Sequence, residues 1–438
     1  MALPDLIEIV PLDKPVRAEI TVPGSKSITN RALILAALAD GETILNGALW
    51  SEDTQIMVEC LQDLGFMVNV DPDPNETCNR TITGYGDGGR VPPGGTEQQP
   101  MELFVGNAGT AARFLAAFVC LGKGVYRLHG VPRMHERPQA ALFQALRELG
   151  YRVDSPNDKL PVVIYGDGPK PGAKCRASIE ESSQFASALL LGARVGGWKI
   201  EVVGENAEES PYVAMTSKLM EVFPHRAGKF QIEPDASSGS YFWGAGWLLE
   251  KESESEIRVC DLLDGPEPWQ QDAKFSRFVP PKQNIRFIIS RATDLADSIM
   301  TAIVLAPFNQ GVAQMVKFTD LSRLRVQECE RVVALRTELK KCGAQVVEEG
   351  DSLIVWPEHH NRLHGAEIET YNDHRMAMCF AILGLKVPGI KIQNPACVKK
   401  TFPNFFQKLT APPPNGLGVT ILDARTGQRL GLDDLFAE

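Results

Sequence analysis

Residues 24–31 place a lysine and an arginine among small hydroxyl side chains, in the order GSKSITNR. The run ALILAAL that follows consists of strong helix formers, so Lys26 and Ser27 are expected at the start of a helix. The first backbone N–H groups of a helix lack internal partners, and the helix dipole favours an anion there. The segment predicts either a phosphate or carboxylate site, or only a helix that Ser25 caps while Lys26 is solvated.

Further basic residues lie at similar helix starts and in the loops beside them. They are Arg113, Arg133, Arg137, Arg325, Arg331, Arg375, Lys399 and Lys400. Arginine offers a planar fork to phosphate or carboxylate, and lysine offers a point charge. Each one alone is more often a surface charge, but together they predict a strongly cationic cleft. Asp297 and Glu328 lie among them and are expected either to move protons or to form structural ion pairs.

The composition limits the class of protein. A chain of 438 residues is too long for one compact core, so two or more domains are expected. A net charge of −10 argues against broad nucleic-acid binding, and no apolar run reaches the ~18 residues of a membrane span. The N-terminus lacks the features of a signal peptide, and the nine cysteines are scattered without a C-x-x-C pair. We therefore expect a cytoplasmic protein with reduced thiols, no metal site, and no nucleic-acid or membrane partner.

The chain contains about six imperfect repeats, which begin near residues 25, 107, 182, 235, 294 and 372. Each has an Ala/Leu-rich helix, a glycine turn, a β-branched strand, a second helix and a closing strand. Three repeats close on a shared LxxxG phrase at residues 61–68, 146–153 and 339–346, where the glycine is expected to be a left-handed helix cap. This pattern predicts an α/β protein with two domains of three units. The glycine-rich segment 84–95 is expected to be a mobile turn or hairpin tip.

Seven motifs give the chain a family resemblance. They are 24–33 (GSKSITNRAL), 106–113 (GNAGTAAR), 132–138 (PRMHERP), 182–184 (SSQ), 294–297 (DLAD), 371–378 (YNDHRMAM) and 400–403 (KTFP). In this order they closely resemble the EPSP synthase family (3-phosphoshikimate 1-carboxyvinyltransferases), from about residue 7 to 410.

The resemblance implies the two-domain enolpyruvyl transferase fold, an inside-out α/β barrel with three βαβαββ units in each domain. One domain would consist of residues 1–22 and 234–410, the other of residues 23–233, and residues 411–438 would be a C-terminal extension. The implied reaction transfers the enolpyruvyl group of phosphoenolpyruvate to the 5-hydroxyl of shikimate 3-phosphate and releases phosphate. No cofactor or metal is implied, a monomer is expected, and glyphosate is expected to compete with phosphoenolpyruvate.

The same resemblance implies roles for individual residues. Shikimate 3-phosphate would be held by Lys26, Ser27, Arg31, Ser182, Ser183, Gln184, Tyr212, Asp297, Arg323 and Gln327. Phosphoenolpyruvate would be held by Lys26, Asn107, Gly109, Thr110, Arg133, Gln184, Arg331, His374, Arg375 and Lys400. Asp297 would accept the proton of the attacking hydroxyl, Glu328 would move the proton of the methylene carbon, and Lys26 would assist.

Three positions depart from the family pattern. Gln327 stands where the family usually has a lysine, and Arg323 is the nearby cation that would replace it. Glu209 stands where a serine is usual, with Ser210 as its expected substitute. Phe114 stands where many members have proline, and would shift Gly109.

Two alternatives to this reading stay open. One is the sister enzyme that acts on UDP-N-acetylglucosamine, which needs a catalytic cysteine in a mobile loop. The only cysteine in the corresponding stretch is Cys120, in an apolar helix. The other is a non-catalytic homologue that binds shikimate 3-phosphate without turnover.

Overall fold

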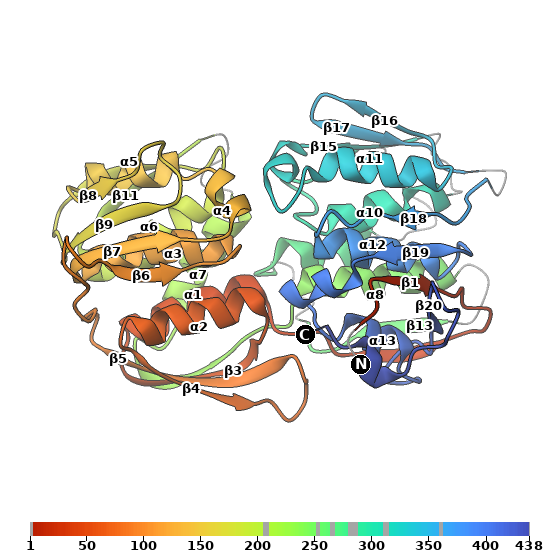
Figure 1. The fold of residues 1–438 in the computed structure, drawn as a ribbon, viewed down its shortest axis with the longest axis horizontal. Coiled ribbons are helices and arrows are strands. Elements are labelled where there is room, and N and C mark those ends of the chain that lie inside the picture. Colours follow the sequence, from red (N-terminus) through yellow and green to blue (C-terminus); the bar gives the residue numbers. More distant parts are fainter. Residues whose placement is uncertain are drawn as a thin grey trace. The chain divides into compact units, whose positions relative to one another are not determined.

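The computed structural model describes residues 3–204, 210–250, 255–262, 268–278, 288–309, 315–358 and 362–437. It divides into two compact units (Figure 1). Unit 1 contains Met1–Pro23 and Pro234–Glu438, and unit 2 contains Gly24–Glu233. Both units mix helices and strands, which confirms the expected α/β class. No helix in the described ranges has the length and apolar character needed to span a membrane.

Unit 2 contains the first three repeats. Its helices are α1 (Lys26–Leu38), α2 (Glu52–Asp63), α3 (Gly109–Phe118), α4 (Pro132–Glu136), α5 (Ala140–Glu148), α6 (Ser183–Gly196), α7 (Pro211–Val222) and the short 3-10 helix η1 (Val119–Leu121). Its strands are β3 (Asp40–Leu49), β4 (Met67–Pro72), β5 (Asn79–Asp87), β6 (Met101–Phe104), β7 (Lys123–His129), β8 (Arg152–Asp154), β9 (Val162–Asp167), β10 (Lys174–Ser178), β11 (Lys199–Val203) and β12 (Arg226–Gln231).

The helices form the interior of unit 2. Strands pair in the orders β12-β3-β5-β4, β6-β7-β9-β8 and β10-β11. Helix α1 contacts α2, α3, α6 and α7, and every residue of α3 is buried. Strands such as β4 alternate exposed and half-buried positions, as expected for an outer sheet. Apolar helices surrounded on all sides by protein thus position the residues at their N-terminal ends.

Unit 1 contains the first two strands of the chain and the last three repeats. Its helices are α8 (Ala236–Glu250), α9 (Phe275–Phe278), α10 (Ile299–Leu305), α11 (Arg331–Lys341), α12 (His374–Gly384) and α13 (Phe405–Thr410), with 3-10 helices η2 (Gln271–Lys274), η3 (Ala306–Phe308), η4 (Ser322–Val326), η5 (Pro395–Lys400) and η6 (Leu432–Leu435). Its strands are β1 (Leu6–Ile9), β2 (Arg17–Ile20), β13 (Glu256–Val259), β14 (Ile288–Ser290), β15 (Val316–Thr319), β16 (Val346–Glu349), β17 (Ser352–Val355), β18 (Glu367–Ile368), β19 (Ile390–Gln393) and β20 (Ile421–Asp423).

Unit 1 repeats the plan of unit 2. Its sheets have the orders β18-β19-β1-β20, β14-β15-β17-β16 and β13-β2. Helices α8, α10 and α12 contact one another, and α10 is buried along its whole length. The segment after Ala411 differs from the expected appendage, because β20 pairs with β1 at the edge of the first sheet. Its apolar residues Leu417, Val419 and Ile421 are part of the core of the unit.

The glycines of the LxxxG phrase end their helices as expected. Gly65, Gly150 and Gly343 have φ values of 92°, 90° and 85°. This left-handed conformation is one that glycine adopts without strain, and β4, β8 and β16 begin two or three residues later. The glycine-rich segment 84–95 differs in part from its prediction, because residues 84–87 belong to strand β5.

Candidate active site

Lys26 is the first residue of α1 and forms an ion pair with Asp53. Its Nζ lies 3.1 Å from the Oδ2 atom of Asp53, and that carboxylate is buried in the first turn of α2. Ser27 follows on the same helix and is half-buried. The ion pair fixes the direction of the lysine side chain before any ligand is present. Lys26 is therefore held at a helix start, where the first backbone N–H groups have no acceptor within the helix itself.

Two buried serine hydroxyls lie at the starts of α1 and α7. Ser25 precedes α1 and Ser210 precedes α7, and neither side chain caps its helix. Among the described residues, neither Oγ atom has a hydrogen-bond partner, although Ser25 is 1% exposed and Ser210 6%. An unsatisfied buried hydroxyl is costly, so both sites favour a polar ligand. Tyr212 is the second residue of α7, directly after Pro211.

The start of α6 is organised around Gln184. Ser182 caps this helix by accepting a hydrogen bond from the backbone N–H of Gln184 at 3.3 Å, and Ser183 is buried beside it. The Oε1 atom of Gln184 accepts a hydrogen bond of 3.0 Å from Nη1 of Arg113. The Arg113 guanidinium also lies 5.6 Å from the ring of Phe185. This hydrogen bond fixes the amide oxygen of Gln184 and so orients the side chain.

Gly109 starts α3 between two guanidinium groups. A Cβ atom at this position would lie 2.5 Å from Nη1 of Arg113 and 2.7 Å from Nη2 of Arg137. Arg137 is buried and donates a hydrogen bond of 3.3 Å to the carbonyl of Asn107. A side chain at this position would therefore displace the ends of these two arginines. The next residue, Thr110, accepts a hydrogen bond of 2.9 Å from Asn30 of α1.

Arg31 points into the protein. Its Nε donates to Thr216 at 2.7 Å, its Nη1 to the Ser27 carbonyl at 2.8 Å and its Nη2 to Ser187 at 3.0 Å. The side chain is 1% exposed, and burial lowers the pKa of the guanidinium to about 10. In this structure the three nitrogens contact protein acceptors, so Arg31 holds α1 against α6 and α7.

Phe114 packs on Arg31. Its ring centroid lies 5.2 Å from the guanidinium carbon, within the range of a cation–π contact, and the ring is buried. The departure at this position therefore affects Arg31 directly.

Arg133 lies on α4 with its side chain 40% exposed, and its guanidinium lies 2.6 Å from the carboxylate of Glu136.

Arg331 is the centre of the charged cluster in unit 1. The guanidinium is 1% exposed and lies 2.6 Å from Asp373, 2.8 Å from Glu328 and 3.8 Å from Asp297. It also donates a hydrogen bond to the amide oxygen of Gln327. Burial opposes the charge, but the three carboxylates outweigh it and raise the pKa of Arg331 above its ordinary value.

Asp297 meets two further arginines. Its Oδ1 atom accepts a hydrogen bond of 2.7 Å from Arg291, and its Oδ2 atom lies 3.4 Å from Arg375. Burial disfavours the charged form, but Arg375, Arg291 and Arg331 together hold the pKa of this carboxyl well below its ordinary value. Asp297 is consequently ionised at neutral pH and is a weak base until those cations are drawn away.

Glu328 and Asp373 complete the cluster. Glu328 contacts Arg331 through one oxygen and lies 3.5 Å from Lys400 through the other. Asp373 caps α12 by accepting a hydrogen bond of 2.9 Å from the backbone N–H of Arg375. The cations of this cluster are therefore paired with carboxylates, at Arg331, Arg375 and Lys400, and the predicted cationic cleft stays a prediction. A substrate anion would have to compete with these carboxylates.

The remaining predicted residues of unit 1 lie near this cluster or on its elements, and Tyr241, which was not predicted, lies beside Arg375. His374 is buried at the first position of α12, with its Nδ1 3.7 Å from Asp373. The phenol of Tyr241 lies 3.5 Å from Nη1 of Arg375, and burial raises the pKa of that phenol. Arg323 is half-buried on η4, four residues before Gln327. Glu209 lies outside the described residues.

The profile of the EPSP synthase (3-phosphoshikimate 1-carboxyvinyltransferase) family matches residues 11–226 and 224–409. The chain belongs to this family. It is 35% identical to the 3-phosphoshikimate 1-carboxyvinyltransferase of Nostoc punctiforme, over 92% of this chain and 98% of the relative. The 3-phosphoshikimate 1-carboxyvinyltransferase of Pseudomonas syringae is 36% identical, over 95% of this chain and 98% of the relative. The solved EPSP synthase of Acinetobacter baumannii is similar in fold, with a TM-score of 0.70 at 20% identity, over 95% of this chain and 99% of that chain.

Sequence reasoning gave no role to three residues that contact the EPSP synthase motifs. Asp53 pairs with Lys26, and Arg291 pairs with Asp297. Asp373 lies inside the motif 371–378, where its position before a helix was the only signal of a capping role. Asp53 and Lys26 lie on different helices, whereas Arg291 and Asp297 lie six residues apart between β14 and α10, and no motif indicated either pair.

Proposed function

We propose that this protein transfers the enolpyruvyl group of phosphoenolpyruvate to the 5-hydroxyl of shikimate 3-phosphate, releasing phosphate, in the shikimate pathway to chorismate and the aromatic amino acids. The family match supports this activity, because relatives that carry its name align over nearly their full length. The observation that carries the proposal is that one buried guanidinium, Arg331, contacts both carboxylates assigned to proton transfer, Asp297 and Glu328.

Unit 2 is proposed to hold shikimate 3-phosphate at the starts of α1, α6 and α7. Lys26 supplies a charge, and the hydroxyls of Ser27, Ser182 and Ser183 supply hydrogen bonds to phosphate and hydroxyl groups. Tyr212 and the amide nitrogen of Gln184 add further contacts. Arg31 is proposed as a positioning residue, because its nitrogens are bonded to Thr216, Ser187 and the Ser27 carbonyl.

The family resemblance assigns phosphoenolpyruvate to Arg331, Arg375 and Lys400 in unit 1, and it also names residues of the turn 107–110 in unit 2. The phosphate and carboxylate of phosphoenolpyruvate would compete with Asp297 and Glu328 for these cations. Each charge-assisted hydrogen bond contributes roughly 1.5–3 kcal/mol, so several are needed to offset the desolvation of two polyanions. Lys26, Arg133, Gln184 and His374 are further proposed contacts, and Arg323 and Gln327 are proposed to lie beside shikimate 3-phosphate.

The chemistry moves protons through two carboxylates, Asp297 and Glu328. In the addition step, Asp297 accepts the proton of the 5-hydroxyl while Glu328 delivers a proton to the methylene carbon, and the new C–O bond forms at the neighbouring carbon. In the elimination step, a methyl proton returns to Glu328, the C–O bond to phosphate breaks, and the leaving phosphate takes the proton that Asp297 had accepted. The cations stabilise the phosphate as it leaves. Substrate anions that draw Arg331 and Arg375 away raise the pKa of Asp297, so base strength develops when the substrates are bound.

The structure favours this reaction over the sister transferase. A nucleophilic cysteine needs an accessible, stabilised thiolate. Cys120 is fully buried on η1, and burial raises the pKa of its thiol well above the ordinary value. This residue is therefore an inert core thiol.

A phosphate-release assay tests the function. Purified protein is incubated with phosphoenolpyruvate, with and without shikimate 3-phosphate, and inorganic phosphate is measured over time. Release that requires shikimate 3-phosphate supports the proposal. Release that does not depend on it, or binding of shikimate 3-phosphate without any release, contradicts it; the latter result identifies a non-catalytic homologue.

We further propose a cytoplasmic monomer that glyphosate inhibits. All nine cysteines are free, which supports a reducing compartment. Glyphosate carries a phosphonate and a carboxylate, the two groups that Arg331, Arg375 and Lys400 are proposed to bind. Light scattering tests whether the protein is a monomer. Inhibition by glyphosate at varied phosphoenolpyruvate concentrations tests whether the two compounds compete.

A further inference from the structure

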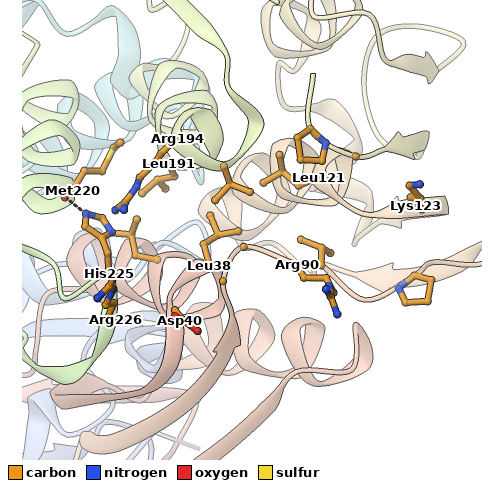
Figure 2. Close-up of a pocket in the computed structure, with 18 residues that line it drawn as sticks. Leu38, Asp40, Arg90, Leu121, Lys123, Leu191, Arg194, Met220, His225 and Arg226 are labelled. Carbon is orange, nitrogen blue, oxygen red and sulfur yellow. Dashed lines mark hydrogen bonds between the residues drawn. The ribbon is translucent and has the colours of Figure 1, made fainter. Parts of the chain in front are cut away.

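A cavity of about 830 Å³ lies within unit 2 (Figure 2). The ends of three helices line it, through Leu38 of α1, Arg194 of α6 and Met220 of α7. Helix α1 begins at Lys26, and at 1.5 Å per residue Leu38 lies about 18 Å along the helix from it. The cavity is therefore at the opposite ends of these helices from the residues proposed to bind shikimate 3-phosphate, and it does not rest on the proposed function.

Apolar side chains form the middle of this cavity. Leu38, Leu121 and Leu191 lie between the charged residues in the view of Figure 2. Leu121 and Leu191 are otherwise buried, at 4% and 2% exposure, so the cavity opens onto the core of the unit. Such a wall favours the apolar body of a ligand over water.

Cationic side chains surround the apolar wall. Figure 2 shows Arg194 and Arg226 on one side and Arg90 and Lys123 on the other, with Asp40 as the one lining carboxylate. Arg90 contacts Asp87 at 3.4 Å, outside the cavity. Among the described residues, Lys123, Arg194 and Arg226 form no ion pair. In a chain with a net charge of −10, this gathering of positive charge selects for an anion.

The glycine-rich segment supplies one wall of the cavity. Residues 88–91 and Pro93 line it, and Gly89 has a φ of 88°. A Cβ atom at Gly89 would lie 2.8 Å from the methyl groups of Val195 on α6. The segment is thus packed directly against α6, and the wall exists before any ligand binds.

We propose that this cavity binds a small organic anion with an apolar body, such as an aromatic carboxylate. The leucines would contact the body, and Arg194 and Arg226 would bind the charged group. The volume falls within the usual range of about 300–1,000 Å³ for small-molecule sites. Inorganic phosphate would pair with the cations but would not cover the leucines. A neutral hydrocarbon would cover the leucines but would leave the cations without a counter-charge.

Two fluorescent probes test the site. One is ANS, an anilinonaphthalene sulfonate, and the other is N-phenylnaphthylamine, a closely related fluorophore without the sulfonate. We expect ANS to bind the intact protein, and the double variant Arg194→Glu/Arg226→Glu to weaken ANS by about tenfold or more. The neutral probe should change by less than about twofold. The matched control is Lys229→Glu, an exposed cation on the same strand as Arg226 that does not line the cavity.

Two further variants locate the bound probe. Leu38→Trp fills the cavity and should abolish the binding of both probes, whereas Lys26→Ala should leave both unchanged. Circular dichroism and the melting temperature establish that each variant folds, and Arg194→Gln is the milder replacement if the double variant does not. The proposal is overturned if ANS does not bind, if ANS affinity is equal in the double variant and in Lys229→Glu, if it survives Leu38→Trp, or if it is lost in Lys26→Ala.

Discussion

Arg291 donates a hydrogen bond of 2.7 Å to Asp297, and both side chains are buried. Arg291 lies in the turn after β14, outside the motifs that identify the family. Arg331 and Arg375 approach the same carboxylate from α11 and α12. Of these three cations, Arg331 and Arg375 are proposed substrate ligands. Arg291 is assigned no substrate contact, and its part in the mechanism is its hydrogen bond to Asp297. Arg291 is therefore the residue that orients the proposed base.

Removing the Arg291 charge should move the pH dependence of turnover. Arg291→Gln takes away one of the three arginines that lower the pKa of Asp297, so this pKa rises. Because the proposed base works only when ionised, the acid limb of the kcat–pH profile shifts to higher pH. The control Arg291→Lys keeps the charge and should shift the limb less. A limb that stays in place in Arg291→Gln would show that Asp297 is not the titrating base.

Asp297→Asn and Glu328→Gln should each lower kcat by about a hundredfold or more, the usual contribution of a general acid or base. Both substitutions keep the shape of the side chain. Shikimate 3-phosphate affinity, measured by calorimetry, should be largely retained in Glu328→Gln, because this ligand is assigned mainly to unit 2. Normal turnover in either variant would refute its assigned role.

Gly109→Ala should weaken phosphoenolpyruvate binding. The added Cβ would lie 2.5 Å from Arg113 and 2.7 Å from Arg137, so the turn or the arginines must move. Displacements of this size cost about tenfold to a hundredfold in well-organised sites, and we expect that increase in the KM for phosphoenolpyruvate. Gly84→Ala is the matched control, because its Cβ would meet only the Ala36 methyl at 3.5 Å. Equal KM values in the two variants would count against the role of the turn.

Phe114→Leu should lower the affinity for shikimate 3-phosphate. The substitution removes the ring that lies 5.2 Å from the Arg31 guanidinium and with it a contact of about 1 kcal/mol. Phe118→Leu is the control, since Phe118 is equally buried on α3 but packs on Phe66 at 5.6 Å. Both variants should lose stability to denaturant, and only Phe114→Leu should lose ligand affinity. If both lose affinity equally, Arg31 positioning is not the cause.

Gln327→Lys should lower the KM for phosphoenolpyruvate. Gln327 accepts a hydrogen bond from Arg331, which contacts three carboxylates. A lysine there adds a positive charge to a balanced cluster, so a substrate anion is bound more strongly. Gln327→Met, which has similar size without charge, should not lower this KM. A KM that is unchanged in Gln327→Lys would assign the missing charge to another residue.

The positions of helix starts were predictable from local sequence. Gly65, Gly150 and Gly343 end helices where the repeated phrase predicted, because a left-handed cap depends on a few adjacent residues. Lys26, Ser182 and Arg375 lie at the starts of helices, which also depend on a few adjacent residues. Local propensity and capping therefore place many of the candidate residues on their elements.

The pairing of charges was not predictable. Asp53 and Lys26 meet through the packing of α2 on α1. Arg31 belongs to the motif 24–33, yet the direction of its side chain is set by Thr216, a residue 185 positions away. The strand β20 likewise pairs with β1 at the other end of the chain. Such contacts depend on tertiary packing, which periodicity does not encode.

Phosphorus NMR of a single reaction mixture tests the central claim most directly. The protein is added to equal amounts of phosphoenolpyruvate and shikimate 3-phosphate, and all phosphorus resonances are followed together. We predict that both substrates decay at the same rate while inorganic phosphate and one new phosphomonoester appear in equal amounts. Phosphate that appears while the shikimate 3-phosphate resonance stays constant, or a mixture that does not change, would contradict the proposed transfer.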